Sequence, residues 1–318
     1  MLGLREKAKS VVRFARRHPW LAAARPSGIN VFNHIFIEPC FNICNLECPY
    51  CPVGQRLKLR GMQQGMMSLD RFKRIWKKSF TNYRGHVGLY NWGEPFLNPE
   101  LPAMVRYART HSAARLVLNS NFSFQCDDRI LEILECLGRD FIIISCDGFS
   151  QATCEKYRVN VDFELVMHNI ELINRKKKRR TYLLWQYLKF PWNLGDLDLA
   201  RQYCKRNRIE FYPGEGGLSS DYPMLPTPSV DRSDQSRCKF LFDSLTVNFD
   251  GEIYPCCAYY GPPQYSLGNA ATTSIDEVFA HGRGKELLDY LTLQSSGDDG
   301  LFCKHCVERN TSVLDSWR

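Results

Sequence analysis

Three cysteines that lie close together in the sequence are the residues best suited to metal chemistry. Cys44, Cys48 and Cys51 have the spacing C-x3-C-x2-C and follow a short apolar run that predicts a strand. Thiolates at such short separations can hold an iron–sulfur cluster, because one loop can wrap a small metal cube. Three protein ligands on a four-iron cluster would leave one iron open. The alternative is a structural zinc site, which would need a fourth ligand such as Cys40, although we expect Cys40 to be a buried thiol.

A second set of cysteines lies towards the C-terminal end of the sequence. Cys238, Gly251 and Cys256 form the pattern Cys-x12-Gly-x4-Cys, and Cys303 and Cys306 follow as a C-x2-C pair. Between them, two strand-like runs flank an Asp-Gly turn and predict a hairpin. On ligand chemistry alone, four thiolates in this order could hold either an iron–sulfur cluster or a zinc ribbon.

The elements that must position the first cysteine loop alternate between strand and helix patterns. Six strands alternating with five helices imply a parallel sheet with right-handed crossovers. The predicted fold class is therefore α/β, a partial (β/α)6 barrel followed by a small C-terminal domain. Ser68 and Asn98 are expected helix N-caps. The predicted strands are 34–39, 85–91, 115–119, 141–145, 181–187 and 209–212, and the predicted helices are 68–80, 98–111, 127–137, 162–175 and 196–207.

Polar residues follow the predicted strands, at the edge where parallel barrels bind their ligands. The second strand leads into residues 91–95, with the sequence Asn-Trp-Gly-Glu-Pro, and the third into Asn-Ser-Asn at 119–121. The fourth leads into Ser-Cys-Asp-Gly at 145–148. Arg158 could bind a carboxylate through its fork of N–H donors, and Gln186 lies within the fifth strand. Each signal is weak alone, but they occur in order behind the cysteine loop.

Together, the cysteine loop and these strand ends resemble the radical S-adenosylmethionine (SAM) superfamily. In that superfamily the open iron chelates the amine and carboxylate of SAM, and the reduced cluster cleaves SAM to a 5′-deoxyadenosyl radical. Residues 91–95 resemble its Gly-Gly-Glu-Pro motif, which holds the SAM ammonium, with Trp92 in place of the first glycine. The resemblance implies that the cofactor-binding residues are Gly93, Glu94, Asn121, Ser145, Asp147, Arg158 and Gln186.

The second cysteine set resembles the SPASM/Twitch auxiliary-cluster domain, together with Ser-Leu-Gly-Asn at 266–269 and Ile-Asp-Glu-Val-Phe at 275–279. No cysteine follows Cys306, so the resemblance is to the shorter Twitch version with one auxiliary four-iron cluster. Cys257, beside Cys256, is either a packing thiol or a hydrogen-atom donor to a substrate radical. The metal ligands implied by the two resemblances are Cys44, Cys48, Cys51, Cys238, Cys256, Cys303 and Cys306.

The 318 residues divide into four predicted segments: a basic arm at 1–30, the barrel at 31–213, a linker rich in Gly, Ser and Pro at 214–237, and the auxiliary domain at 238–318. The arm carries seven Lys/Arg against one Glu, and it contributes most of the net charge of +8. Residues 4–18 predict an amphipathic helix that either packs on the body or contacts a membrane surface.

The charge pattern and the absence of a secretory signal limit the partners and the compartment. Outside the arm and the basic run 175–180 the chain is mildly acidic, which argues against a nucleic-acid-binding body. The fourteen cysteines come without a signal peptide or a long apolar run, so metal binding or burial in a reducing compartment is favoured over disulfides. We expect a cytoplasmic protein, with peripheral membrane contact through the arm as an alternative.

The resemblance implies an oxidoreductase that abstracts hydrogen from a small, carbohydrate-like substrate. The Twitch branch includes the 2-deoxy-scyllo-inosamine dehydrogenase type, in which an auxiliary cluster can accept the remaining electron. A reductant such as flavodoxin or ferredoxin is the expected partner. The base is not identified, although Glu210, Glu215 and Asp221 are candidates by location. The alternatives are a peptide- or protein-modifying enzyme, a radical epimerase, and a non-enzymatic protein stapled by zinc.

Overall fold

The computed structural model describes residues 29, 32, 34–51, 53–54, 63–216, 244–256 and 265–291. The predicted basic arm lies almost entirely outside these residues, as do most of the predicted linker and part of the predicted auxiliary domain. Four of the cysteines predicted to act also lie outside them: Cys238, Cys257, Cys303 and Cys306.

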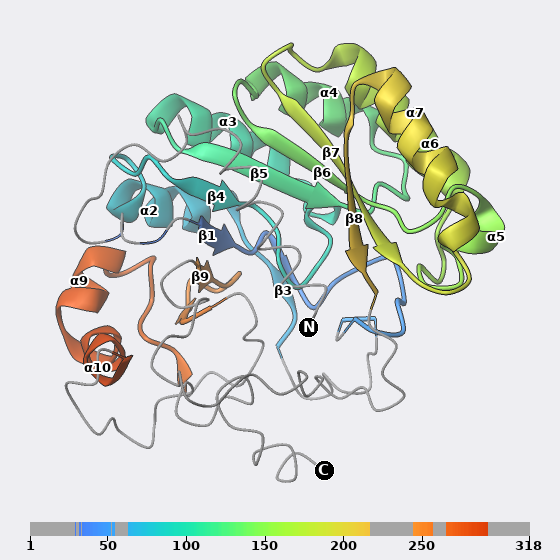
Figure 1. Ribbon diagram of the computed structural model, residues 1–318. Coiled ribbons are helices and arrows are strands. Elements are labelled where there is room, and N and C mark those ends of the chain that lie inside the picture. The colour runs from blue at the N-terminus through green and yellow to red at the C-terminus, as the bar shows by residue number, and fades with distance from the viewer. Residues whose placement is uncertain are drawn as a thin grey trace, which may run out of the picture.

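An eight-stranded sheet forms the centre of the described molecule, in the order β10-β9-β1-β4-β5-β6-β7-β8 (Figure 1). Every neighbouring pair is parallel except β9 and β10, which form an antiparallel hairpin. The six strands from β1 to β8 in this sheet are the predicted barrel strands, so the α/β partial barrel is confirmed. The strands are β1 His34–Ile37, β4 His86–Gly88, β5 Arg115–Ser120, β6 Phe141–Ser145, β7 Tyr182–Lys189, β8 Glu210–Glu215, β9 Ser244–Val247 and β10 Ile253–Tyr254.

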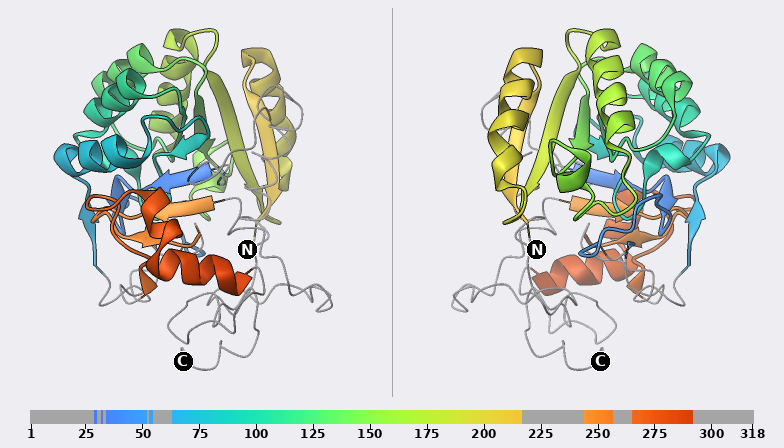
Figure 2. Two further views of the ribbon diagram at one scale, coloured as in Figure 1. Left: turned by 90° about the vertical axis from the view of Figure 1, so that its left-hand side faces the viewer. Right: turned by 90° about the vertical axis from the view of Figure 1, so that its right-hand side faces the viewer.

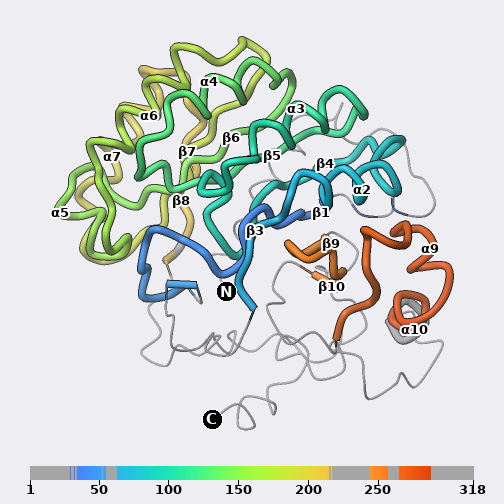
Figure 3. The backbone as a smooth tube through the Cα atoms, turned by 180° about the vertical axis from the view of Figure 1, so that it is seen from behind, coloured from blue at the N-terminus to red at the C-terminus, as the bar shows by residue number. Residues whose placement is uncertain are grey.

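Helices cover one face of the sheet, which curves so that they lie on its outer side (Figures 2 and 3). Four of the described α-helices begin with a side-chain cap. Among them, Ser68 accepts a hydrogen bond from Arg71 N at 3.3 Å, and Asp162 accepts one from Leu165 N at 3.0 Å. The main helices follow the predicted ones within a few residues: α2 Leu69–Ser79, α3 Leu101–His111, α4 Asp127–Cys136, α6 Phe163–Lys176 and α7 Leu197–Asn207.

Asn98 is not the N-cap that the sequence pattern predicts. The helix α3 begins after Glu100, and a 3-10 turn, η3 (Pro95–Leu97), precedes Asn98. The Asn98 side chain is buried, and its Nδ2 donates to the carbonyl oxygens of Pro39 and Met67, both at 2.9 Å. Asn98 therefore ties the end of β1 to the start of α3, because a buried amide needs several partners and finds them in two separate segments.

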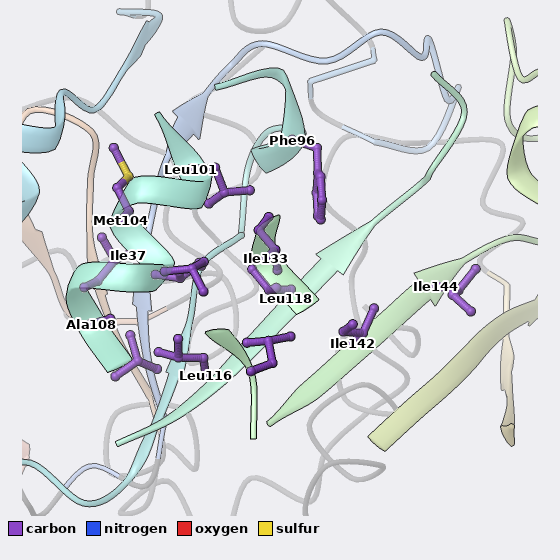
Figure 4. Close-up of a cluster of buried hydrophobic side chains, with 14 of the residues drawn as sticks. Ile37, Phe96, Leu101, Met104, Ala108, Leu116, Leu118, Ile133, Ile142 and Ile144 are labelled. Atoms are coloured by element: carbon purple, nitrogen blue, oxygen red, sulfur yellow. The ribbon is translucent and has the colours of Figure 1, made fainter. Parts of the chain in front are cut away.

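The hydrophobic core lies between the outer face of the sheet and the helices (Figure 4). Successive strand residues point to opposite faces, so alternate positions of each strand enter this core. The opposite, inner face therefore carries the intervening residues, and strand register places Ser145 beside Gln186 on it. The core-facing residues include Leu116 and Leu118 of β5, Ile142 and Ile144 of β6, and Leu101, Met104, Ala108 and Ile133 of the helices.

The C-terminal segment is joined to the barrel through the sheet itself, which the sequence did not predict. Strand β9 pairs with β1 along its whole length, from His34↔Ser244 to Ile37↔Val247. The helices α9 (Ile275–Ala280) and α10 (Gly282–Leu291) follow, and Ile275 N donates to Ser79 Oγ of α2 at 3.0 Å. The predicted hairpin is confirmed as β9–β10.

Two short strands outside the main sheet, β2 (Cys40–Phe41) and β3 (Gly65–Met66), pair on either side of the first cysteine loop. Phe249, in the turn between β9 and β10, stacks against Phe41 with ring centroids 6.0 Å apart. The C-terminal hairpin therefore contacts the base of this loop. Among the described residues, none of the helices has the length and apolar character needed to cross a membrane.

Candidate functional site

The first cysteine loop presents three free thiols next to backbone and side-chain N–H donors. Leu46 N lies 3.4 Å from Cys44 Sγ, and Asn121 Nδ2 approaches the same sulfur at 3.9 Å. Gly54 packs against the loop so closely that a methyl group added to it would lie 2.4 Å from the Cys48 carbonyl oxygen. N–H donors to sulfur and close packing around the ligand loop are features of metal-bound thiolates.

An apolar cover surrounds the cysteine loop. Phe41, Val53 and Trp92 form a small buried cluster against which Cys44 and Cys51 pack. Burial, followed by the charge of nearby Glu94, raises the pKa of the Cys44 thiol to about 12. The Cys44 thiol therefore remains protonated until a metal displaces its proton.

The donor set fits an iron–sulfur cluster. Three cysteines with free thiols lie on one short loop, next to a small apolar cluster and with N–H donors at one sulfur. Among the described residues, no group of three His, Cys, Asp or Glu side chains is placed to hold a single metal ion. A cluster that meets each thiolate through a different iron does not require such convergence.

Gly93 and Glu94 lie directly beside the cysteine loop. A side chain cannot fit at Gly93, because a methyl group there would lie 2.3 Å from the Cys40 carbonyl oxygen and 2.9 Å from that of Ile43. Glu94 N donates to Ile43 O at 2.8 Å, so the two loops are joined edge to edge. The glycine is therefore required by the close approach of two backbones.

The Glu94 carboxylate is buried and accepts three hydrogen bonds. Its donors are Ser120 Oγ at 2.8 Å, Asn121 N at 3.0 Å and Phe96 N at 3.1 Å. Burial nevertheless raises the pKa of Glu94 to about 7, with these hydrogen bonds acting in the opposite direction. A carboxylate held in this state favours a cationic ligand, because a positive charge would offset the cost of its burial.

Trp92 occupies the position of a glycine in the motif without keeping the two backbones apart. Its ring packs into the apolar cover with Phe41, while its backbone faces the end of β1. Trp92 N donates to Glu38 Oε1 at 2.5 Å, and its carbonyl accepts from Asn42 N at 2.9 Å. Sequence analysis missed Glu38, whose only signal is a charged residue ending an apolar strand.

Asn121 and Ser145 have partners within the protein. Asn121 Nδ2 donates to Asn45 Oδ1 at 2.9 Å and its Oδ1 accepts from Ser123 N at 2.8 Å, so this side chain links β5 to the cysteine loop. Ser145 Oγ donates to Asn119 Oδ1 at 2.7 Å. Both residues lie at the carboxyl ends of their strands, as the sequence predicts.

Asp147 and Arg158 form a buried ion pair. Arg158 Nε lies 2.7 Å from Asp147 Oδ2, and the other carboxylate oxygen accepts from Leu188 N at 2.5 Å. The Asp147 side chain is fully buried, and that of Arg158 is 13% exposed. The Arg158 charge favours the thiolate form of Cys48, although burial dominates and raises the pKa of that thiol. The Asp147 carboxylate therefore holds Arg158 in place near the cysteines and has no free oxygen for SAM.

Gln186 lies on the inner face of β7, beside Ser145 of β6. It is buried, and its carbonyl accepts from Cys146 N at 3.3 Å. The structure therefore brings the predicted residues of β4 to β7 to the carboxyl edge of one sheet, around the cysteine loop. Glu210, a candidate base, begins the strand β8 and is exposed.

The described part of the second cysteine module is built around Gly251. Its φ of +93° is unfavourable for other residues, and a methyl group there would lie 2.7 Å from Asn269 Oδ1. Asn269 Nδ2 in turn donates to Glu252 Oε1 at 2.7 Å. The Cys-x12-Gly-x4-Cys motif and the segment 266–269 are thus in contact, and Cys256 is buried just beyond β10.

Comparison with known proteins identifies two family models in the chain. The radical SAM superfamily model matches residues 39–189, and a model described as an iron-sulfur cluster-binding domain, SPASM, matches residues 238–307. A protein of Methanococcus maripaludis named as a probable GTP 3',8-cyclase is 24% identical over 222 residues, which are 65% of this chain and 72% of that protein.

Solved structures resemble the fold. BtrN in complex with AdoMet and 2-DOIA has a TM-score of 0.50 at 17% identity, over 82% of this chain and 87% of that one. The anSMEcpe structure with bound AdoMet and Cp18Cys peptide has a TM-score of 0.59 at 16% identity, over 81% of this chain and 83% of that one. At these identities the likeness shows the fold alone.

The family matches decide between the two metal hypotheses raised by the cysteine spacing. A radical SAM domain implies a four-iron cluster and SAM, and the second domain implies auxiliary iron–sulfur clusters, so the matches favour iron–sulfur chemistry over structural zinc. Fold, thiol loop and family models agree. The chain therefore carries a radical SAM domain, matched over residues 39–189, followed by a SPASM-type iron–sulfur cluster-binding domain.

Proposed function

We propose that the protein is a radical SAM oxidoreductase acting on a small, carbohydrate-like substrate. The observation that carries the proposal is the position of the cysteine loop, beside Glu94 and Arg158 at the barrel edge and in contact with the hairpin of a second cysteine module. When bound, the cluster and SAM supply a 5′-deoxyadenosyl radical that abstracts hydrogen. An auxiliary cluster in the C-terminal module would accept the remaining electron.

The protein's own residues would bind and orient the cofactors. Cys44, Cys48 and Cys51 would ligate the first cluster, and Glu94, buried and bonded on one side by three donors, would bind the SAM ammonium. Arg158, oriented by Asp147, would meet the SAM carboxylate with the guanidinium donors that this ion pair leaves. We assign supporting contacts to Gly93, Asn121, Ser145 and Gln186, and auxiliary ligation to Cys238, Cys256, Cys303 and Cys306.

The partners and boundaries follow the same proposal. An external reductant such as flavodoxin or ferredoxin would supply electrons. We place the domain boundaries at residues 30, 213 and 237. Strand β9 follows the last boundary but pairs within the barrel sheet. We place the protein in the cytoplasm, and the basic arm at 1–30 would supply any peripheral membrane contact.

The similar proteins differ in the substrates or ligands that their names give, so more than one substrate class has to be considered. BtrN was solved with 2-DOIA and anSMEcpe with a peptide, while the Methanococcus relative is named for GTP. Peptide modification is the second candidate, and epimerisation with Cys257 as hydrogen donor is a third. We favour the small molecule because the second cysteine set resembles the Twitch branch, and because the BtrN structure, solved with 2-DOIA, shares the fold over 87% of its chain.

The test is reconstitution followed by SAM cleavage. Anaerobically purified protein should contain about eight irons if two four-iron clusters are present, and it should form 5′-deoxyadenosine with dithionite and SAM. Changing Cys44, Cys48 or Cys51 to alanine should abolish this product, whereas C136A, at the end of α4 and away from the loop, should not. Changing Cys303 and Cys306 should lower the iron content. Product formation by C48A would refute the cluster assignment.

A further inference from the structure

Three buried polar atoms on the inner face along β1 and β9 have no hydrogen-bond partner. They are His34 Nε2, Glu38 Oε2 and Thr246 Oγ1. The three residues are 9%, 1% and 2% exposed, so bulk water does not satisfy them. Buried polar atoms in folded proteins are almost always paired, and each exception calls for a physical explanation.

The strand register places the three side chains on one surface. In the β1–β9 pair Phe36 lies opposite Thr246, and His34 and Glu38 are two residues before and after Phe36. Alternate residues share a face, so Thr246 lies beside the span between His34 and Glu38. Ile35 and Ile37, which point the other way, belong to the helix-facing core. The three unpartnered atoms therefore face the barrel interior where its first strand meets the C-terminal module.

Packing prevents two of these side chains from turning towards other partners. The Glu38 carboxyl group is held by Trp92 N, which donates to Oε1, and by a hydrogen bond with the Asn91 side chain, while Oε2 has no partner. The His34 ring stacks on Phe36 at 4.3 Å and lies over Gly88, where an added methyl group would be 2.8 Å from Nε2. The glycine makes room for the imidazole. A residue held in place with an unmet hydrogen-bonding group resembles a binding site more than a packing defect.

The charges on this surface restrict the ligand. Burial lowers the pKa of His34 to about 3, so the imidazole is neutral. The described inner-face positions of β1 and β9 are His34, Phe36, Glu38, Ser244 and Thr246, which include no lysine or arginine. The arginine that shares the inner face, Arg115 of β5, is two strands away from His34. Phosphate groups are normally bound by cations or by helix N-termini. A carboxyl group, a hydroxyl group and a neutral imidazole instead suit hydroxyl and amine groups.

We propose that His34, Glu38 and Thr246 form the part of the substrate site that binds an unphosphorylated polyol or amino-polyol. The inference rests on the proposed function, because it supplies the substrate class for the same barrel. Thr246 and the carboxyl of Glu38 bind substrate hydroxyl or amine groups on the β1–β9 side, opposite the predicted SAM contacts on β5 to β7. The C-terminal module thus contributes directly to substrate selection.

The test uses the full chain, reconstituted with iron and sulfide and saturated with SAM. Thr246→Val removes the unpartnered hydroxyl, and Glu38→Gln keeps the acceptor for Trp92 N but removes the acid. The matched control is Thr181→Val, because Thr181 is equally buried but its hydroxyl donates to Gly138 O at 3.0 Å. Melting temperatures are measured alone and with myo-inositol, glucosamine, 2-deoxystreptamine, glucosamine 6-phosphate and GTP.

Without a probe, T246V should melt about 2 °C or more above the parent protein, since it removes a buried unpaired group, whereas T181V should melt below it. At least one unphosphorylated probe should raise the melting temperature of the parent protein, and both T246V and E38Q should lose that shift. The proposal is overturned if T246V is destabilised like T181V, which would indicate a bound water. It is also overturned if only GTP or the sugar phosphate binds, if no probe binds, or if the shift survives both substitutions.

The proposed radical SAM function and the proposed substrate site can be refuted independently of each other. Formation of 5′-deoxyadenosine by the parent protein tests the radical SAM function without any of these probes. If that product forms but the polyol probes fail, only the substrate site is refuted. If the product does not form although a polyol binds at Glu38 and Thr246, the proposed oxidoreductase function is refuted instead.

Discussion

At the scale of single residues, the site depends on two backbones that touch. Gly93 lies against the carbonyl oxygens of Cys40 and Ile43, and this contact sets the distance between the cysteine loop and Glu94. Glycine is needed at this position for its small size and not for its conformational freedom, because φ at Gly93 is not in the left-handed region. The glycine is therefore a spacer rather than a hinge.

Gly93→Ala should separate the two loops. The added methyl group would meet backbone oxygens that cannot rotate away, so we expect a loss of about 1–3 kcal/mol in unfolding free energy and loss of 5′-deoxyadenosine formation. Urea denaturation measures the first effect. The control is Gly195→Ala, where an added methyl group meets nothing within 4 Å and stability should change by less than about 0.5 kcal/mol. Equal stability of the two variants would contradict this account.

Glu94 should make stability depend on pH. Its folded pKa of about 7 lies above the ordinary 4.5, so the folded state binds the proton more tightly than the unfolded chain does. The stability linked to this group is complete below about pH 4.5 and is lost as the pH rises through 7. For protein without SAM, the unfolding free energy of the parent should fall relative to Glu94→Gln by up to about 3 kcal/mol between pH 4.5 and 8. A constant difference across this range would show that the three donors keep Glu94 ionised.

At the scale of elements, the Asp147–Arg158 pair joins the end of β6 to the end of β7. Asp147 binds Arg158 and Leu188 N, while Asn193 Nδ2 donates to its carbonyl at 2.7 Å. One carboxylate thus fixes an arginine and the path of the chain after two strands. Removing its charge would leave a largely buried guanidinium without its partner.

Asp147→Asn should destabilise the protein by about 3–5 kcal/mol, the usual cost of breaking a buried ion pair from one side. The matched control is Asp198→Asn, whose partner is Arg201 on the exposed surface of α7. Exposed pairs contribute little, so this variant should lose less than about 1 kcal/mol. Chemical denaturation compares the two, and similar losses would mean that the Asp147 carboxylate is not essential to the barrel edge.

The elements were predictable because their signals are local. Apolar alternation and helical periodicity locate all six barrel strands and the five main helices, and Ser68 caps its helix as expected. Asn98 was misassigned because its partners, Pro39 and Met67, are distant in sequence. Glu38 and Thr246 were missed for the same reason: nothing in an apolar strand shows which of its polar atoms will remain unpaired.

At the scale of the whole molecule, the two cysteine modules share one sheet. The pairing of β1 with β9 covers what would otherwise be an open edge of the barrel. Sequence analysis treated the C-terminal module as a separate domain, because pairing between residues more than 200 positions apart has no local signal. Phe249 adds a second contact by stacking on Phe41 beside the first cysteine loop.

A chain ending at residue 216 should not behave as an independent barrel. It would expose the backbone of β1 together with the apolar residues Ile35 and Ile37, and open edges of this kind promote aggregation. We expect it to be insoluble or aggregated by size-exclusion chromatography. A chain ending at residue 291 keeps β9, β10, α9 and α10, and it should remain soluble with less iron than the full chain. A soluble, monomeric barrel from residues 1–216 would contradict this view.

The shared sheet also has a consequence for how the protein is made. His34 pairs with Ser244, so β1 leaves the ribosome about 210 residues before its partner strand does. At a synthesis rate of about 5–20 residues per second, that edge stays open for roughly 10–40 seconds. During this interval the thiols of Cys44, Cys48 and Cys51 belong to an incomplete barrel. Metal insertion into the first cluster is therefore expected after release of the chain, and a cell short of chaperones should accumulate the protein without its iron.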